Sequence, residues 1–241
     1  MERRQLIVSR DNDRLRLVRK LHERRWRDKL GLFFVEGEDA VAAATAEPVD
    51  LLRAGEDVEP RLLGEVATAP HPPRVIGVYR RGDLPAWEER PTSLLLWQVA
   101  DPGNVGTLLR TADAFGAAVG LSERCADPTS PKALRASAGS IWRVPLGDWA
   151  EAGGARRVAL VAHGGEPLPN VALEGRVAFL LGAEREGLPG DVPRDVDATI
   201  PLAGAESLNV AAAGAVALYE WARQTQIESS PPRHGLRSNQ P

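Results

Sequence analysis

From residue 93 onward, short apolar runs alternate with helical patterns, and this alternation limits the fold more than any other feature of the chain. The run "SLLLWQVA" at residues 93–100 is almost uninterrupted, as expected for a strand that is buried on both faces. Amphipathic or alanine-rich helical patterns follow at residues 105–117, 131–139 and 207–224. Strands that alternate with helices predict an α/β fold with a mostly parallel, doubly wound sheet. A ligand is then expected beyond the carboxyl ends of the strands.

The first part of the chain has a different pattern, which predicts a separate small domain. Leu15, Val18 and Leu21 form an apolar stripe at helical spacing, with Trp26 as a further candidate, and this predicts one helix over residues 12–29. Further strands and a helix are expected in "GLFFVEGEDAVAAA", "VDLLRA" and "PRVIGVY". The predicted division is a small α/β domain over residues 1–80, a proline-containing linker over 81–92, the larger domain over 93–227 and a disordered polar tail over 228–241.

Positive charge is concentrated at the start of the chain. Residues 1–30 hold 11 Lys and Arg against 5 Asp and Glu, whereas the whole chain has 30 against 33 and a net charge of −3. The whole molecule is therefore not a basic nucleic-acid binder, but its first helix has enough charge to contact phosphates. A solvated surface helix is the alternative. The residues expected to contact the nucleic acid are Arg19, Lys20, Arg24, Arg25 and Arg27.

Several classes of protein are excluded or disfavoured by what the sequence lacks. One cysteine, Cys125, allows no intrachain disulfide, and the four histidines have no ligand spacing, so we expect no metal. No apolar run reaches the roughly 20 residues of a membrane span, and no signal peptide is recognisable, so we expect a cytoplasmic protein without membrane contact. Neither G-x-G-x-x-G nor G-x-x-x-x-G-K-[ST] occurs, which disfavours a nicotinamide-dependent enzyme and a nucleotide triphosphatase.

Three glycine-bearing loops stand where predicted strands end. They read "DPGNVGTLLR" at 101–110, "LGAEREGLP" at 181–189 and "IPLAGAESLNVAAA" at 200–213. Glycine lets a backbone approach a ligand or adopt positive φ, and each loop adds polar side chains. Taken singly, each of these side chains also has an ordinary structural explanation. Asn104 could be a turn residue and Arg110 a surface arginine, while Glu184 could be a solvated acid and Ser207 a helix cap. The residues alone therefore predict a three-loop ligand site beside a basic module that faces RNA or DNA.

The three loops, in this order, resemble the motifs of the SpoU family of RNA ribose 2′-O-methyltransferases, within the trefoil-knotted SPOUT superfamily. The matching positions are Asn104 and Arg110 in the first loop, Gly182, Glu184 and Gly187 in the second, and Ser207, Leu208 and Asn209 in the third. The resemblance covers about residues 93–225 and includes the intervening "SPKALRASAGSIWRVPL". The chain departs from the family pattern at Ala183, where Asn is common, and at Ala211, where Ser is common.

This resemblance implies an α/β fold with a trefoil-knotted SPOUT domain and S-adenosylmethionine as the methyl donor, bound bent inside the knot. The residues that it implies for the cofactor are Leu181, Gly182, Ile200, Leu202 and Leu208. The residues that it implies for catalysis are Asn104, Arg110, Glu184, Ser207 and Asn209. It also implies a homodimer in which Arg110 faces the partner's cofactor. The N-terminal region is similar to the substrate-binding domain of these enzymes.

Arg110 is the residue to which the resemblance assigns help with deprotonation of the ribose hydroxyl. A guanidinium is almost always protonated, so its simpler roles are to bind the adjacent phosphate and to stabilise the forming alkoxide. Asn104 is expected to orient the ribose or Arg110, and Glu184 to fix the loops. The expected substrate is ribosomal RNA, and transfer RNA is the alternative. A non-catalytic RNA-binding factor and an enzyme of antibiotic self-resistance also stay open.

Overall fold

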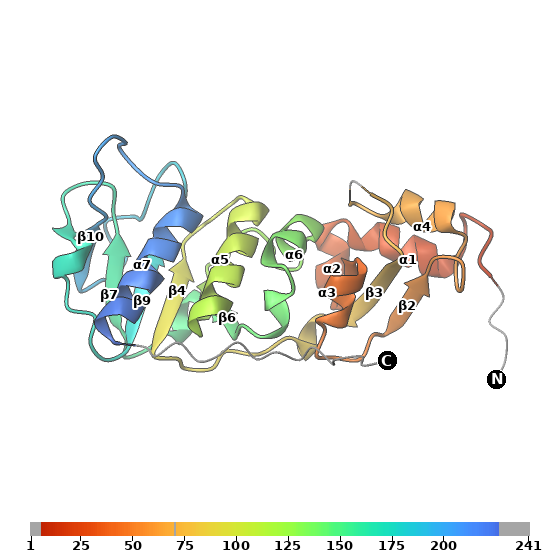
Figure 1. The fold of residues 1–241 in the computed structure, drawn as a ribbon, viewed down its shortest axis with the longest axis horizontal. Coiled ribbons are helices and arrows are strands. Elements are labelled where there is room, and N and C mark those ends of the chain that lie inside the picture. The colour runs from red at the N-terminus through yellow and green to blue at the C-terminus, as the bar shows by residue number, and fades with distance from the viewer. Residues whose placement is uncertain (1–5, 70, 227–241) are drawn as a thin grey trace, which may run out of the picture.

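The computed structural model describes residues 6–69 and 71–226, which build two sheets with their own helices (Figure 1). A three-stranded sheet in the order β1-β3-β2 lies in the first 80 residues, and a seven-stranded sheet in the order β6-β5-β4-β9-β7-β10-β8 follows. Figure 1 shows the two sheets in opposite halves of an elongated molecule. The predicted tail at 228–241 lies outside the described residues.

The N-terminal unit, described over residues 6–80, is an antiparallel sheet covered by short helices. Its elements are α1 (Asp13–Leu21), α2 (Arg24–Leu30), β1 (Leu32–Glu36), α3 (Glu38–Ala42), β2 (Asp50–Arg53), α4 (Pro60–Val66) and β3 (Val75–Arg80). The apolar stripe of α1 is buried against Phe34 of β1 and Ile76 of β3. The helix α4 was not predicted, because its seven residues are too short for a clear period.

The predicted single helix over residues 12–29 is two helices, which corrects the expectation from the sequence. The chain leaves α1 at His22, and Glu23 is extended, with φ −94° and ψ 133°. Arg27 of α2 turns back and donates 2.8 Å hydrogen bonds from Nη1 to the carbonyls of Leu21 and His22. Carbonyls at a helix end lack partners within the helix, so this guanidinium stabilises the break.

The two units are packed together and share one core. Because side chains alternate along a strand, Phe34 faces the N-terminal unit's own core while Phe33 and Val35 face the larger sheet's unit. Phe33 and Tyr79 surround Trp142, with ring centroids 5.5 Å and 4.7 Å from it. The position of the N-terminal unit is therefore set by buried aromatic packing as well as by the connection through residues 81–92.

The C-terminal unit is the all-parallel sheet with three helices. Its elements are β4 (Thr92–Leu96), α5 (Pro102–Phe115), β5 (Ala118–Leu121), α6 (Pro131–Ser137), β6 (Leu146–Asp148), β7 (Arg156–Leu160), β8 (Glu166–Pro167), β9 (Val177–Leu181), β10 (Val196–Thr199) and α7 (Val210–Gln224). Every ladder in this sheet is parallel, as the sequence predicts. Short 3-10 turns occur at 81–83, 140–142, 149–151 and 168–170. Among the described residues, no helix has the length and apolar character needed to cross a membrane.

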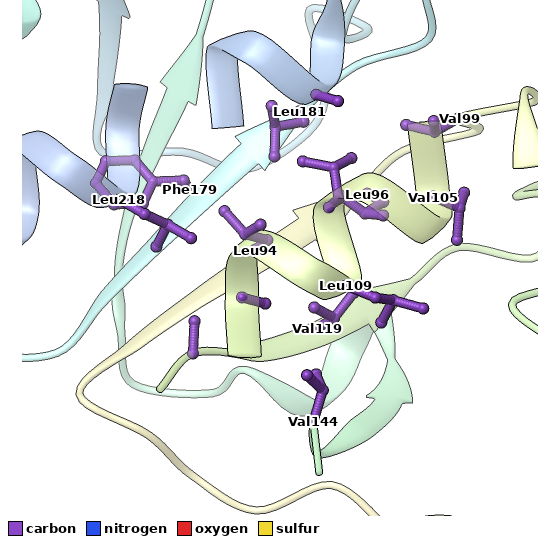
Figure 2. Close-up of a cluster of buried hydrophobic side chains, with 14 of the residues drawn as sticks. Leu94, Leu96, Val99, Val105, Leu109, Val119, Val144, Phe179, Leu181 and Leu218 are labelled. Carbon is purple, nitrogen blue, oxygen red and sulfur yellow. The ribbon is translucent and has the colours of Figure 1, made fainter. Parts of the chain in front are cut away.

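The two faces of this sheet are covered differently, which corrects the doubly wound arrangement. Figure 2 shows Leu94 and Phe179 on the face that packs with Leu109 of α5 and Leu218 of α7. The alternate residues, such as Leu180, belong to a second cluster with half-buried tryptophans at 87, 97 and 149. Within the described residues this second cluster contains no α-helical residue. The apolar strand pattern shows that both faces are covered, but it does not show by what.

Candidate active site

A cavity of about 480 Å³ opens where β7, β9 and β10 end. The parallel register brings these ends level, because Leu160 of β7 pairs with Leu181 of β9 on one side and with Ala198 of β10 on the other. The cavity is lined by the residues after the three strands and by the start of α7. Its place beyond the carboxyl ends of the strands agrees with the expectation from the sequence.

All the residues predicted to hold a cofactor line this cavity, namely Leu181, Gly182, Ile200, Leu202 and Leu208. Glu184, Ser207 and Asn209 line it as well, whereas Asn104 and Arg110 do not. Sequence reasoning missed residues 160–162, which form another wall. The apolar run "RRVALVAH" at residues 156–163 contains them, so the carboxyl end of this run was the available signal.

The lining suits a ligand that has both an apolar ring and a charged end. Leu160, Ile200 and Leu208 supply apolar walls, while Glu206 and Ser207 supply a carboxylate and a hydroxyl. The volume lies in the range of roughly 300–1,000 Å³ that is typical of small-molecule sites. S-adenosylmethionine, with an adenine ring and an amino-acid end, fits this combination. No group of three or more potential metal ligands occurs in the described part of the chain.

Gly182 is required by the packing of its own loop. A Cβ on Gly182 would lie 2.2 Å from the carbonyl carbon of Gly187 and 2.4 Å from the nitrogen of Leu188. Ala183 and Gly187 exchange backbone hydrogen bonds of 3.1 Å and 2.9 Å, which close this loop. Gly187 has φ +67°, whereas Gly182 and Gly204 do not have positive φ. Of these three loop glycines, only Gly187 therefore uses the left-handed backbone that glycine permits.

Three side chains connect the three sequence motifs by hydrogen bonds. Asn104 Nδ2 donates to Glu184 Oε1 at 2.9 Å, and Asn209 Nδ2 donates to Asn104 Oδ1 at 3.1 Å. The backbone N–H groups of Ala100 and Asp101 also approach the Glu184 carboxylate, each at 3.4 Å. Both polar atoms of the Asn104 side chain are therefore engaged, which does not fit the expectation that Asn104 orients Arg110. The expectation that Glu184 fixes the loops agrees with these contacts.

The carboxylate of Glu184 stays ionised because of these donors. Burial by itself raises the pKa of Glu184, but the Asn104 amide and backbone N–H groups of residues 184, 100 and 101 outweigh it. The pKa therefore lies below its ordinary value. A negative charge is thus held at the edge of the cavity at neutral pH.

The start of α7 differs from the prediction in one residue. Asn209, and not Ser207, caps the helix: its Oδ1 accepts from the N–H groups of Ala211 at 2.9 Å and Ala212 at 3.3 Å. Asn and Ser are both favoured caps, so the sequence could not choose between positions two residues apart. Asn209 consequently joins the cap of α7 to the Asn104–Glu184 pair.

The stretch "DPGNVG" is the first turn of α5, and not a flexible turn before it. Asp101 caps the helix by accepting from the Asn104 N–H at 3.0 Å, and Pro102 occupies the first helical position. Gly106 is buried, and a Cβ there would lie 2.3 Å from the carbonyl oxygen of Ala133 in α6. The glycine therefore allows the close packing of two helices and is not needed for the approach of a ligand.

Arg110 lies about two turns into α5, on its exposed face. The helical pattern was predicted to begin at residue 105, about one turn before Arg110, but α5 already begins at Pro102. In the described part of the chain, Arg110 forms no ion pair or side-chain hydrogen bond. Its guanidinium is therefore available to an external anion such as a phosphate.

Some of the side chains predicted to contact RNA in the N-terminal unit already bind other groups of the protein, and others are exposed. Arg27 is 3% exposed and forms a 2.7 Å ion pair with Asp127, so its assignment as an RNA contact is wrong. Arg24 donates to the Cys125 carbonyl, and Arg19 donates to the Arg10 carbonyl. Arg25 pairs with a neighbouring acid, and Lys20 is exposed. A count of basic residues in the sequence cannot tell which side chains are engaged inside the protein and which are exposed.

Comparisons with known proteins agree with this site. Residues 91–219 match the model of the SpoU rRNA Methylase family. A 23S rRNA (guanosine(2553)-2′-O)-methyltransferase of Bacillus subtilis is 30% identical over 88% of this chain and 97% of its own length. An uncharacterized tRNA/rRNA methyltransferase of Synechocystis sp. is 30% identical over 93% and 96%. The structure of an AdoMet-bound rRNA methyltransferase from Sinorhizobium meliloti superimposes with a TM-score of 0.81 at 28% identity, over 91% of this chain and 97% of that one.

Proposed function

The chain belongs to the SpoU rRNA methylase family, and we propose that it methylates the ribose 2′-hydroxyl of a nucleotide in ribosomal RNA. It is an RNA methyltransferase that uses S-adenosylmethionine. The observation that carries the proposal is the cavity at the strand ends, whose rim holds the Glu184–Asn104–Asn209 hydrogen bonds. These bonds join all three family motifs at one place.

The residues Leu181, Gly182, Ile200, Leu202 and Leu208 are proposed to hold the cofactor in this cavity. When bound, S-adenosylmethionine supplies an electrophilic methyl group on a sulfonium. The leucine and isoleucine walls exclude water from the apolar part of the ligand. The trefoil knot also belongs to this proposal. Membership of the SpoU family, which lies within the trefoil-knotted SPOUT superfamily, supports it.

Arg110 is proposed to bind the phosphate next to the reacting ribose. A guanidinium can hold a phosphate through two parallel hydrogen bonds, and its charge stabilises the alkoxide that forms as the hydroxyl loses its proton. The proton leaves through Arg110 or through a neighbouring water. Asn104 and Glu184 are proposed to position the loops around the reacting hydroxyl, and Ser207 and Asn209 to complete the pocket.

Arg110 is proposed to act at the cavity of a second copy of the chain. It does not line the cavity of its own chain, although it is exposed and has no partner there among the described residues. The exposed face of α7 carries Val216 and Tyr219 together with small alanines, and the Tyr219 side chain is 62% exposed. An apolar face of small residues allows close helix packing, which supports a homodimer through α7.

Ribosomal RNA is preferred over transfer RNA because of the N-terminal unit. The relative named as a 23S rRNA methyltransferase matches this chain over 88% of its length, so the match extends beyond the residues of the family model. We propose that residues 1–80 bind the substrate and that residues 93–227 carry catalysis, joined by 81–92. Transfer RNA, a non-catalytic role and antibiotic self-resistance are the alternatives, and a cytoplasmic location stays a prediction.

The test is to incubate the protein with methyl-labelled S-adenosylmethionine and separated RNA fractions, and then to identify the labelled nucleosides. Label in a 2′-O-methyl nucleoside of ribosomal RNA is expected. Label in transfer RNA would change the substrate and keep the chemistry. Absence of both label and cofactor binding would favour the non-catalytic role.

Variants of Arg110 test the assignment of this residue. Arg110→Ala should lower kcat by about 100- to 1,000-fold with cofactor affinity unchanged, since it removes one donor to a developing charge. Arg110→Lys should be intermediate, because an ammonium cannot bind bidentately. Arg61→Ala, an exposed change on α4, is the control. Full turnover by Arg110→Ala would contradict the assignment.

A further inference from the structure

The helix α2 carries a tryptophan that is surrounded by cations. Trp26 is half-buried and not part of the core. Lys20 Nζ lies 5.1 Å from the centroid of its ring, Lys29 Nζ lies 5.2 Å away, and the Arg25 guanidinium carbon lies 5.8 Å away. These distances are within the reach of cation–π attraction. Such a half-exposed ring with three nearby cations has no role in the fold or in the site described above.

The two lysines at this ring differ from the neighbouring arginines. Ion pairs engage the arginines at positions 10, 14, 16, 24, 25 and 27. Lys20 and Lys29 are exposed and form no ion pair among the residues that the structure describes. The unpaired ammonium groups of α1 and α2 therefore both lie at Trp26. Free positive charge beside an aromatic face is the combination that binds a nucleotide.

We propose that Trp26 is a stacking platform for an unpaired base of the RNA substrate, and that Lys20 and Lys29 bind the phosphates on either side of that base. This inference rests on the proposed function, since it requires an RNA substrate. A base in a duplex has both faces covered by its neighbours, so the ring selects single-stranded segments, loops or bulges. An entering base displaces an ammonium from the ring, and that flexible ammonium then moves to a phosphate.

The platform has a defined position relative to the C-terminal unit. Figure 1 shows α2 in the part of the N-terminal unit that faces α6. The buried Arg27–Asp127 pair and the 3.1 Å bond from Arg24 to the Cys125 carbonyl attach this helix to the segment before α6. A base held by Trp26 would therefore lie at a constant separation from the methylated ribose. The geometry points to substrates with an unpaired base at one fixed spacing from the target.

The experiment measures binding of the full chain to oligouridylate and to an RNA duplex of equal length over a series of salt concentrations. Trp26→Ala should weaken binding of oligouridylate by about 5- to 150-fold, which is the usual cost of losing one base stack. The salt dependence of oligouridylate binding should be the same for this variant as for the original protein. Binding of the duplex should change little, and Trp26→Phe should retain most of the affinity because it keeps an aromatic face.

The charge variants separate the lysines from general electrostatics. Lys20→Gln with Lys29→Gln should lower the slope of log K against log salt by about 1.4, or about 0.7 for each lost phosphate contact on a single strand. Arg10→Gln with Arg16→Gln removes two charges from the same region and should leave the slope almost unchanged, since both arginines are paired with acids. Thermal unfolding of each variant shows that a loss of binding is not a loss of fold.

The outcomes distinguish this inference from the proposed function. If the original protein methylates RNA but Trp26→Ala binds oligouridylate equally well, the platform is refuted and the function stands. Equal weakening of oligouridylate and duplex by Trp26→Ala would also refute the stacking role. If the original protein neither binds nor methylates any RNA, the platform and the proposed function both fail.

Discussion

Replacement of Asp127 by Asn should destabilise the protein strongly, because Asp127 connects the two units through a buried ion pair. Its side chain is 5% exposed, and its Oδ2 accepts from Arg27 Nε at 2.7 Å and from Arg81 Nη2 at 2.6 Å. Its Oδ1 accepts from the backbone N–H and hydroxyl of Thr129 at 2.9 Å and 2.7 Å. An amide in this place would keep one acceptor and would direct N–H groups at two guanidinium groups.

The magnitude follows from the burial of the partners. Removing one partner of a buried pair costs roughly 3–5 kcal/mol, because an unpaired charge is left in the interior. Arg27 is almost inaccessible, but the Arg81 side chain is 28% exposed and can regain some hydration. We therefore expect a loss of about 3 kcal/mol, near the lower limit. For a chain of this size that corresponds to a fall in Tm of about 6–12 °C.

Chemical and thermal unfolding at neutral pH measure this loss, with Asp13→Asn as a matched control. Asp13 also pairs with an arginine, Arg16, but its side chain is 92% exposed, so the control should lose less than about 1 kcal/mol. A loss below about 1 kcal/mol for Asp127→Asn, or equal losses for both variants, would refute the reasoning from burial.

The pH dependence gives a second check on Asp127. Burial raises the pKa of its carboxyl, but Arg81, Thr129 and Arg27 outweigh burial and hold the pKa below its ordinary value of 3.8. A lowered pKa in the folded state means that the carboxylate stabilises the fold fully above 3.8 and loses this effect as the pH falls through the folded pKa. The stability difference between the original protein and Asp127→Asn should therefore shrink only in strong acid. A difference that changes near neutral pH would contradict this assignment.

Two further variants test the candidate site. Gly182→Ala should abolish cofactor binding in calorimetry or unfold the loop, because its Cβ would lie 2.2 Å from the Gly187 backbone, whereas Gly204→Ala meets nothing within 4 Å and should bind normally. Glu184→Gln should weaken cofactor binding by about tenfold, the equivalent of one hydrogen bond to a charged group, and unchanged affinity would argue against a role for the Asn104 bond. Because the pKa of Glu184 is lowered, the stability difference from the original protein should persist above its ordinary value of 4.5 and fade as the pH drops through the folded pKa.

Local patterns in the sequence predicted much of the fold and most of the cavity. The apolar runs located the longer strands of the parallel sheet but not the short edge strands β6 and β8. The rule that ligands bind beyond strand ends located the residues that follow β9 and β10. The sequence showed correctly that glycines matter in those loops, but the structural reason for each glycine differs from the one that was expected. Gly182 avoids a backbone contact with Gly187, and Gly106 lets α5 approach α6. The sequence shows that a side chain is missing, and only the fold shows what occupies its place.

Partners that are distant in the chain were decided by the tertiary structure alone. Arg27 has the same sequence context as the exposed arginines around it, yet Asp127, 100 residues later, makes it part of the interior. Asn104 likewise looked like a turn residue until the fold placed Glu184 and Asn209 beside it. Helical and strand periods depend on neighbouring residues, so the sequence by itself determined them. Charge pairing and burial depend on which elements meet in space, so they became defined only when the chain was folded.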